Sequence, residues 1–93
     1  MAFEWDEAKR ATNLRDHGVD FEDAALIFAG PVIEADDTRV DYGEPRLRAV
    51  GQVEGEFFML AYTWRGQNRR IISAWRLNDD GRKRYETILS RGA

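Results

Sequence analysis

The dipeptide Gly30-Pro31 divides the chain into two parts with different hydrophobic periods, and this division constrains the fold more than any other feature. Glycine followed by proline ends a helix, because proline cannot continue the helical hydrogen-bond ladder. Before the dipeptide, apolar residues recur at the i, i+3, i+4 and i+7 spacing of one helix face, at Phe21, Ala24, Ala25 and Phe28. After it, short runs rich in β-branched and aromatic residues alternate with turn residues. The sequence therefore predicts helices first and a sheet afterwards.

The first thirty residues contain the start and stop signals of two helices. Asp6 and Asp20 are each suited to accept hydrogen bonds from the free amides of a first helical turn. We expect the first helix over residues 7–17, ended by Gly18 in the left-handed conformation, and the second over residues 21–28. The aromatic run at residues 3–5 precedes both helices and is expected to form a short edge strand.

Strand-like segments and a closing helix follow. Strands are expected at residues 32–35, 46–53, 56–64 and 69–76, with an acidic loop at 36–45 and turns at Gly55 and at 65–68. Asn78 is suited to cap a last helix whose apolar side is Tyr85, Ile88 and Leu89. This order predicts an α+β domain with a short N-terminal strand, two helices, a three- to four-stranded antiparallel sheet and a C-terminal helix. One domain is expected over residues 1–93.

Composition excludes several classes of site. The chain has no cysteine, which removes disulfides, thiolate metal sites and cysteine nucleophiles, and a single histidine, His17, cannot form a multi-histidine metal site within one chain. No apolar run approaches the roughly 20 residues of a membrane span, and the N-terminus lacks the basic start and apolar stretch of a signal peptide. We expect a cytoplasmic protein that uses no metal or cofactor.

Charge is distributed unevenly along the chain. Residues 1–45 carry four basic and twelve acidic side chains, a net −8, whereas residues 46–93 carry ten basic and five acidic side chains, a net +5. A region of one sign attracts partners of the opposite sign. The arginine-rich half therefore points to an anionic ligand, and RNA is the first candidate.

Strand alternation assigns the arginines to sheet faces. In the last strand, alternation predicts Arg70 and Arg76 on one face and Ser73 and Trp75 on the other. Long side chains at strand ends can rim one side of the sheet, and the candidates are Arg46, Arg48, Arg65, Arg70 and Arg76. Exposed Trp64 and Trp75 are candidates for stacking on unpaired bases. The alternative is that these arginines are solvated or paired with acids and that the tryptophans serve packing.

RNA cleavage requires groups that hold the phosphate, activate a 2′-hydroxyl for in-line attack and stabilise the charge of the transition state. Guanidinium groups hold phosphate and stabilise its charge. His17, Lys9 or Tyr85 can assist proton transfer. For His17 the alternative is a residue that complements the dipole at a helix C-terminus.

Several runs occur together in one order: Phe3-Glu4-Trp5-Asp6, Lys9, Asn13-Leu14, His17-Gly18-Val19, Phe21-Glu22-Asp23-Ala24, Tyr42-Gly43-Glu44, Arg46, Gly51, Tyr62-Thr63, Arg65-Gly66, Arg70-Ile71-Ile72-Ser73-Ala74 and Arg84-Tyr85-Glu86. With these runs, nearly the whole chain resembles the BrnT toxins of bacterial type II toxin–antitoxin systems. The resemblance implies a RelE-like fold and an endoribonuclease that inhibits translation. It also implies neutralisation by a BrnA-type antitoxin, which supplies the part that binds operator DNA.

The resemblance places site residues at Lys9, His17, Arg46, Arg65, Arg70 and Tyr85. On this reading Arg70 and Arg76 hold phosphate, Tyr85 orients the substrate, and the antitoxin covers the arginine-rich surface. The family pattern usually has an arginine after Ile-Ser-Ala, where this chain has Trp75 followed by Arg76.

Two other functions remain open. One is a binding module that has lost catalysis and only binds an antitoxin. Such a module would act as a co-repressor together with the antitoxin. The other is a stand-alone DNA-binding regulator, which is disfavoured because residues 6–29 are acidic and no basic recognition helix is visible.

Overall fold

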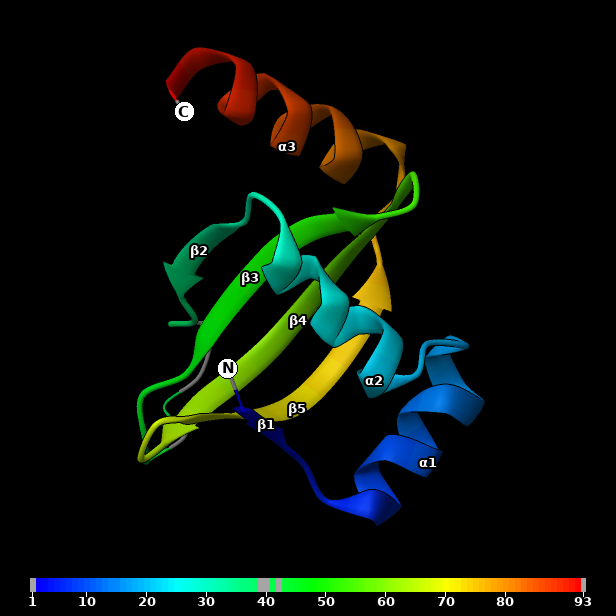
Figure 1. The fold of residues 1–93 in the computed structure, drawn as a ribbon, viewed down its shortest axis with the longest axis vertical. Coiled ribbons are helices and arrows are strands. Elements are labelled where there is room, and N and C mark those ends of the chain that lie inside the picture. The colour runs from blue at the N-terminus through cyan, green and yellow to red at the C-terminus, as the bar shows by residue number, and fades with distance from the viewer. Residues whose placement is uncertain (1, 39–40, 42, 93) are drawn as a thin grey trace.

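The computed structural model describes residues 2–38, 41 and 43–92. The expected acidic loop at 36–45 therefore lies partly outside the described residues. The elements, in chain order, are β1 Ala2–Glu4, α1 Glu7–His17, α2 Phe21–Ala24, the 3₁₀ helix η1 Ala25–Ala29, β2 Ile33–Asp36, β3 Leu47–Val53, β4 Glu56–Arg65, β5 Asn68–Arg76 and α3 Asp79–Gly92 (Figure 1). Each predicted strand is present, with ends that differ by one residue or less.

The described strands form one five-stranded sheet in the order β1-β5-β4-β3-β2. The four strands from β2 to β5 pair in antiparallel fashion, and β1 joins the free edge of β5 in parallel. The α+β class is confirmed, but the sheet is mixed rather than purely antiparallel. The parallel strand arises because β1 leads directly into α1, which itself lies along β5 (Figure 1).

The N-caps predicted for the first two helices are confirmed. Asp6 accepts hydrogen bonds from the amides of Ala8 and Lys9, and Asp20 accepts one from the amide of Glu22. Gly18 ends α1 with a φ of 68°, a conformation that favours glycine. The expected second helix over 21–28 is wrong as a single α-helix, because only one α-turn forms before the chain tightens into η1.

The main core lies between the sheet and the α2–η1 segment, which crosses one sheet face (Figure 1). Its largest fully buried side chains are Tyr62, Phe21, Ile27, Leu60, Ile71 and Val19. At the β3–β4 hairpin end of the sheet, α3 packs its Tyr85 ring edge-on against Phe57. The expected apolar side of α3 is correct for Tyr85 but wrong for Ile88, which is 52% exposed.

A β-bulge at Ile72 overturns the predicted face assignment of β5. Ser73 pairs with Ala61 and Ile71 pairs with Tyr62, so Ile72 is an extra residue that has no opposite partner. Beyond the bulge the alternation is reversed. Arg70, Ser73 and Trp75 lie on the face opposite α2 and η1, which we name the open face, whereas Arg76 lies on the helix-covered face opposite Phe58.

Candidate active site

A groove runs between α1 and β5 and borders the open face. Its inner part, with a volume of about 360 Å³, is lined by Ala8, Lys9, Thr12, Asn13, Asp16, His17, Ile72 and Ser73. A neighbouring hollow of about 700 Å³ shares Asp16, His17 and Ser73 with it and adds Trp75 and Arg76. We refer to both parts together as the α1–β5 groove. The structure thus brings together four of the predicted site residues, Lys9, His17, Trp75 and Arg76.

Lys9, Asn13 and His17 lie on one side of α1 because they are spaced four residues apart. Asn13 is buried, and its side-chain amide donates to the backbone carbonyls of Val19 and Ala74 and accepts from the amide of Ala74. The polar wall of α1 is therefore fixed against β5. Lys9 and His17 lie two turns apart, about 12 Å along the helix axis.

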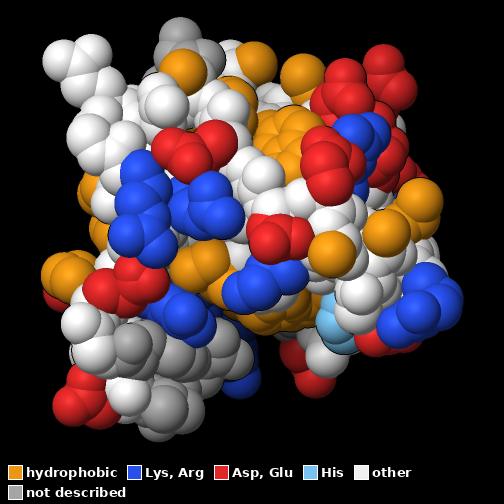
Figure 2. All heavy atoms as spheres, turned by 90° about the horizontal axis from the view of Figure 1, so that it is seen from below, with side chains coloured by type: hydrophobic (Ala, Val, Ile, Leu, Met, Phe, Trp, Pro, Cys, Tyr) orange, Lys and Arg blue, Asp and Glu red, His pale blue; other side chains and the backbone are white. Residues whose placement is uncertain are grey.

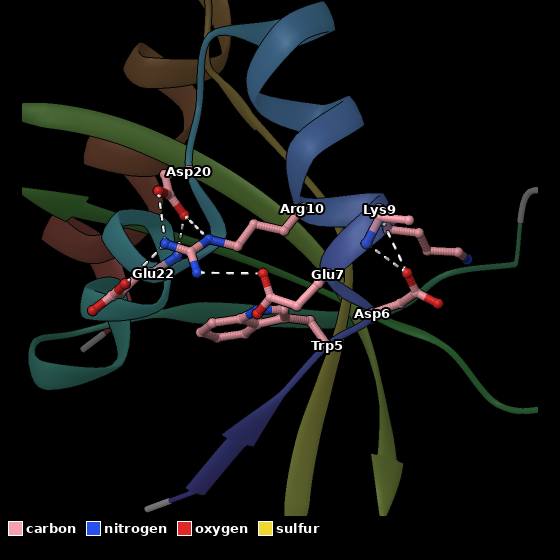
Figure 3. Close-up of polar contacts among 8 residues, drawn as sticks. Trp5, Asp6, Glu7, Lys9, Arg10, Asp20 and Glu22 are labelled. Atoms are coloured by element: carbon pink, nitrogen blue, oxygen red, sulfur yellow. Dashed lines mark hydrogen bonds and ion pairs between the residues drawn. The ribbon is translucent and has the colours of Figure 1, made fainter.

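The two neighbouring cations of α1 have different surroundings. Arg10 donates to Asp20 at 2.8 Å and to Glu22 at 3.0 Å, and its guanidinium lies 5.5 Å from the Trp5 ring centroid. The hydrogen bond from Arg10 lowers the pKa of the Asp20 carboxyl and raises the pKa of the guanidinium itself. Figure 3 shows the Lys9 side chain extending away from this cluster. Within the described part of the chain, Lys9 has no ion-pair partner and is available to a ligand.

Arginines continue from the groove across the open face. Arg70 forms an ion pair with Glu4 at 2.8 Å, and Arg65 approaches Glu44 at 3.5 Å. Arg48 lies opposite Ala35 on β2 and opposite Ala61 on β4. The side chains of these two alanines are short, so they project little from the sheet surface beside Arg48. Figure 2 shows Lys and Arg side chains gathered with acidic ones between them, and the single histidine next to apolar side chains. Arg46 directly precedes β3, where its carbonyl accepts from the amide of Asp37.

The structure does not bring Arg70 and Arg76 together, because the bulge at Ile72 puts them on opposite faces. The Arg76 guanidinium donates to the carbonyl of Gly18 at 3.2 Å and lies 3.5 Å from Glu56. These two arginines therefore cannot bind one phosphate group together.

Tyr85 and Trp64 also lie away from the groove. Tyr85 is buried on α3, where its hydroxyl donates to the carbonyl of Pro31 at 2.7 Å and burial raises its pKa. Trp64 lies on the helix-covered side of β4, edge-on to Tyr62, with the Arg69 guanidinium 4.6 Å from its ring centroid. Neither the orienting role expected for Tyr85 nor a base platform at Trp64 within the groove fits these positions.

Sequence reasoning gave no functional role to Asn13, Asp16 or Ser73. The four-residue spacing of Lys9, Asn13 and His17 could have identified Asn13, because it predicts one polar stripe on a helix. Ser73 could not have been found in this way, because the bulge moves it to the face that alternation did not indicate. Among the described residues, no three His, Cys, Asp or Glu side chains form a group that could hold a metal ion. None of the described helices is long and apolar enough to cross a membrane.

Comparisons with known proteins agree on one family. A family model described as the ribonuclease toxin BrnT of type II toxin–antitoxin systems matches residues 5–80, a range that includes both walls of the α1–β5 groove. The structure is similar to the crystal structure of the ribonuclease toxin BrnT of Brucella abortus, with a TM-score of 0.64 and 29% sequence identity. That similarity covers 85% of this chain and 99% of that chain. No curated protein matches the sequence.

Proposed function

The chain belongs to the BrnT family of ribonuclease toxins from type II toxin–antitoxin systems, and on this premise we propose that it is an endoribonuclease acting in the α1–β5 groove. The observation that carries the proposal is the convergence of Lys9, His17 and Ser73 beside the arginines of the open face. The toxin domain spans residues 1–93 and is RelE-like. It inhibits translation in the cytoplasm and is neutralised by a BrnA-type antitoxin, through which it reaches operator DNA.

Single-stranded RNA lies along the open face in this proposal. Arg48 and Arg70 contact phosphates, with Arg46 and Arg65 at the same end of the sheet, because guanidinium groups form bidentate, permanently charged hydrogen bonds with phosphate. Trp75 lies beside His17 and Ser73, where its ring can stack on an unpaired base. Stacking tolerates any base, so the arrangement favours RNA that is not already paired.

The groove supplies the groups for cleavage without a metal ion. The 2′-hydroxyl oxygen attacks the neighbouring phosphorus in line, and His17 accepts the hydroxyl proton. The bond from phosphorus to the 5′-oxygen breaks, and that oxygen takes a proton from solvent or from His17. The products are a 2′,3′-cyclic phosphate and a 5′-hydroxyl. We assign proton transfer to His17 because it lies with Ser73 and Trp75 in the hollow, whereas Lys9, two turns away, stabilises the charge on phosphate.

Cleavage of labelled single-stranded RNA by the purified chain tests this assignment. His17→Gln is expected to lower kcat by about 10²-fold, the usual contribution of a positioned acid or base, and Lys9→Met is expected to lower kcat/KM. Tyr85→Phe is the matched control, because it removes a polar group that lies outside the groove. Equal cleavage by wild type and the His17→Gln/Lys9→Met double variant would refute the site.

A second function is favoured by one specific observation. Trp75 occupies the open-face position beside His17, while the next arginine, Arg76, is turned away toward Gly18 and Glu56. A chain with tryptophan instead of arginine at position 75 can still bind an antitoxin and act as a co-repressor without cutting RNA. Under this alternative, wild type does not cleave and Trp75→Arg gains activity. Robust cleavage by wild type eliminates it.

A further inference from the structure

A second pocket, of about 290 Å³, lies on the side of β5 and β4 covered by α2 and is separate from the inner groove. Its walls come from the α1–α2 connection, from α2 and η1, and from the β3–β4 hairpin. The apolar part of the lining consists of Val19, Val53 and Phe58. The lining also includes Asp23, Leu26 and Glu54. We name this feature the α2–hairpin pocket. The mechanism proposed above uses none of these six side chains.

The rim of this pocket combines exposed apolar surface with unused negative charge. Leu26 is 56% exposed although it adjoins the apolar wall. Two of the acids lining the pocket already have partners, since Asp20 binds Arg10 and Glu56 lies near Arg76. Asp23 and Glu54, by contrast, have no ion-pair partner within the described part of the chain. A ligand that covers Leu26 and supplies positive charge would satisfy both features.

We propose that the α2–hairpin pocket anchors a basic, apolar segment of the antitoxin, an inference that rests on the proposed toxin function. One apolar side chain of the segment fills the pocket against Leu26 and Val53, and flanking lysines or arginines pair with Asp23 and Glu54. Complementary charge speeds association and excludes wrong partners. RNA is excluded from this pocket, because carboxylates repel phosphate. The toxin then uses surfaces of opposite sign for its two partners, which differs from our expectation that the antitoxin covers the arginine-rich half.

The position of the pocket explains how an anchored partner would neutralise the toxin. Arg76 lines both the α2–hairpin pocket and the hollow that contains His17. Gly18, which also lines the pocket and accepts a hydrogen bond from Arg76, directly follows His17 in the chain. A segment held in the pocket therefore ends beside the groove. Its continuation can cover His17 and Trp75 without any contact to the arginines that hold RNA.

The test uses the purified full-length toxin and the protein encoded by the reading frame adjacent to its gene. Asp23→Lys and Leu26→Asp are expected to weaken that complex by at least about tenfold each in calorimetry, because like charges placed opposite one another and lost apolar contacts are costly at interfaces. The matched controls are Asp80→Lys, which changes an acid in the first turn of α3 as Asp23 is in α2, and Leu14→Asp, which changes an exposed leucine of α1. Cleavage of RNA by each variant alone should equal that of wild type.

The outcomes separate this proposal from the proposed function. Active variants that escape inhibition by the antitoxin, with controls that do not, support the anchor. Unchanged affinity in both Asp23→Lys and Leu26→Asp overturns it, whether or not the toxin cleaves RNA. A wild-type toxin that never cleaves refutes the proposed function, while calorimetry still decides the anchor. Self-association of wild type that Leu26→Asp abolishes, measured by analytical ultracentrifugation, would assign the pocket to a second copy of the chain and overturn the proposal.

Discussion

The side chain of Asn13 hydrogen bonds both backbone groups of Ala74, donating to its carbonyl at 2.8 Å and accepting from its amide at 3.1 Å. These groups lie on the edge of β5 beyond the end of β1, whose last pair is Glu4 with Arg70. Asn13 therefore takes the place of a neighbouring strand at this point. A buried strand edge without such a partner is costly, because its polar groups lose their contact with water.

Replacing Asn13 by Leu is expected to destabilise the chain by about 2–4 kcal/mol, because it leaves the amide and carbonyl of Ala74 buried and unpaired. The measurement is the free energy of unfolding from urea titration followed by tryptophan fluorescence. Thr12→Ala, which changes an exposed neighbour on α1, should stay within about 0.5 kcal/mol of wild type. An Asn13→Leu variant as stable as wild type would show that water or a shifted α1 satisfies the strand edge.

The features of the fold that could be predicted from the sequence are those set by local chemistry. Asp6, Asp20 and Asn78 accept hydrogen bonds from first-turn amides of the helices they precede, as their short polar side chains indicated. The β3–β4 turn forms with positive φ at Glu54 and Gly55, the pattern of a two-residue hairpin. Helix caps and tight turns depend on only a few neighbouring residues, so they can be predicted from a single sequence.

The bulge at Ile72 could not be predicted in this way, and it determines the site. Residues 69–76 contain no glycine or proline that would mark an interruption of the strand. The sequence therefore predicted that their side chains alternate strictly between the two faces of the sheet. In the structure, Ile71 and Ala74 both lie in the core between the sheet and α2, which requires one residue more than strict alternation provides. Tertiary packing therefore decided which arginines lie on the open face. The position of Tyr85 could not be predicted either, because Pro31, whose carbonyl accepts its hydrogen bond, is 54 residues away.

The contact between Arg10 and Asp20 predicts a dependence of stability on pH. Because the pKa of Asp20 in the folded chain is lowered from its ordinary 3.8, the folded state binds the proton less readily than the unfolded state. The stabilisation is therefore fully present above pH 3.8 and is lost as the pH falls through the lower pKa of the folded chain. The urea midpoint of Arg10→Gln should lie below that of wild type at pH 7, and the difference should shrink at pH 3.

The matched control for this prediction is Arg15→Gln. Arg15 contacts Asp16 at 3.1 Å, but both side chains are largely exposed, so solvent screens the pair. Its urea midpoint should match that of wild type at both pH values. If the Arg10→Gln difference persists unchanged at pH 3, the effect comes from packing against Trp5 rather than from the ionised carboxylate.

Gly51 allows η1 to approach the sheet. A Cβ added there would lie 2.8 Å from the Cβ of Ile27 and 3.2 Å from a methyl group of Val32. Gly51→Ala is therefore expected to destabilise the chain by about 1–3 kcal/mol through overpacking. Gly30→Ala is the control, because a Cβ at Gly30 would meet nothing within 4 Å. Thermal unfolding of the two variants measures the contrast, and equal melting temperatures would contradict this reading of the close approach.

Arg48 gives the sharpest test of where RNA lies. It has no ion-pair partner within the described residues, so its charge is available to a phosphate on the open face. For single strands, each neutralised phosphate contributes about 0.7 to the slope of log affinity against log salt concentration.

Fluorescence anisotropy with an RNA whose 2′-hydroxyls are replaced by hydrogen measures binding without cleavage. Arg48→Gln should reduce the magnitude of that slope by about 0.7. Arg15→Gln removes the same charge from the side of α1 that faces away from β5, and it should leave the slope unchanged. Equal slopes for the two variants would show that RNA responds to the net charge of the protein and not to the arginines of the open face.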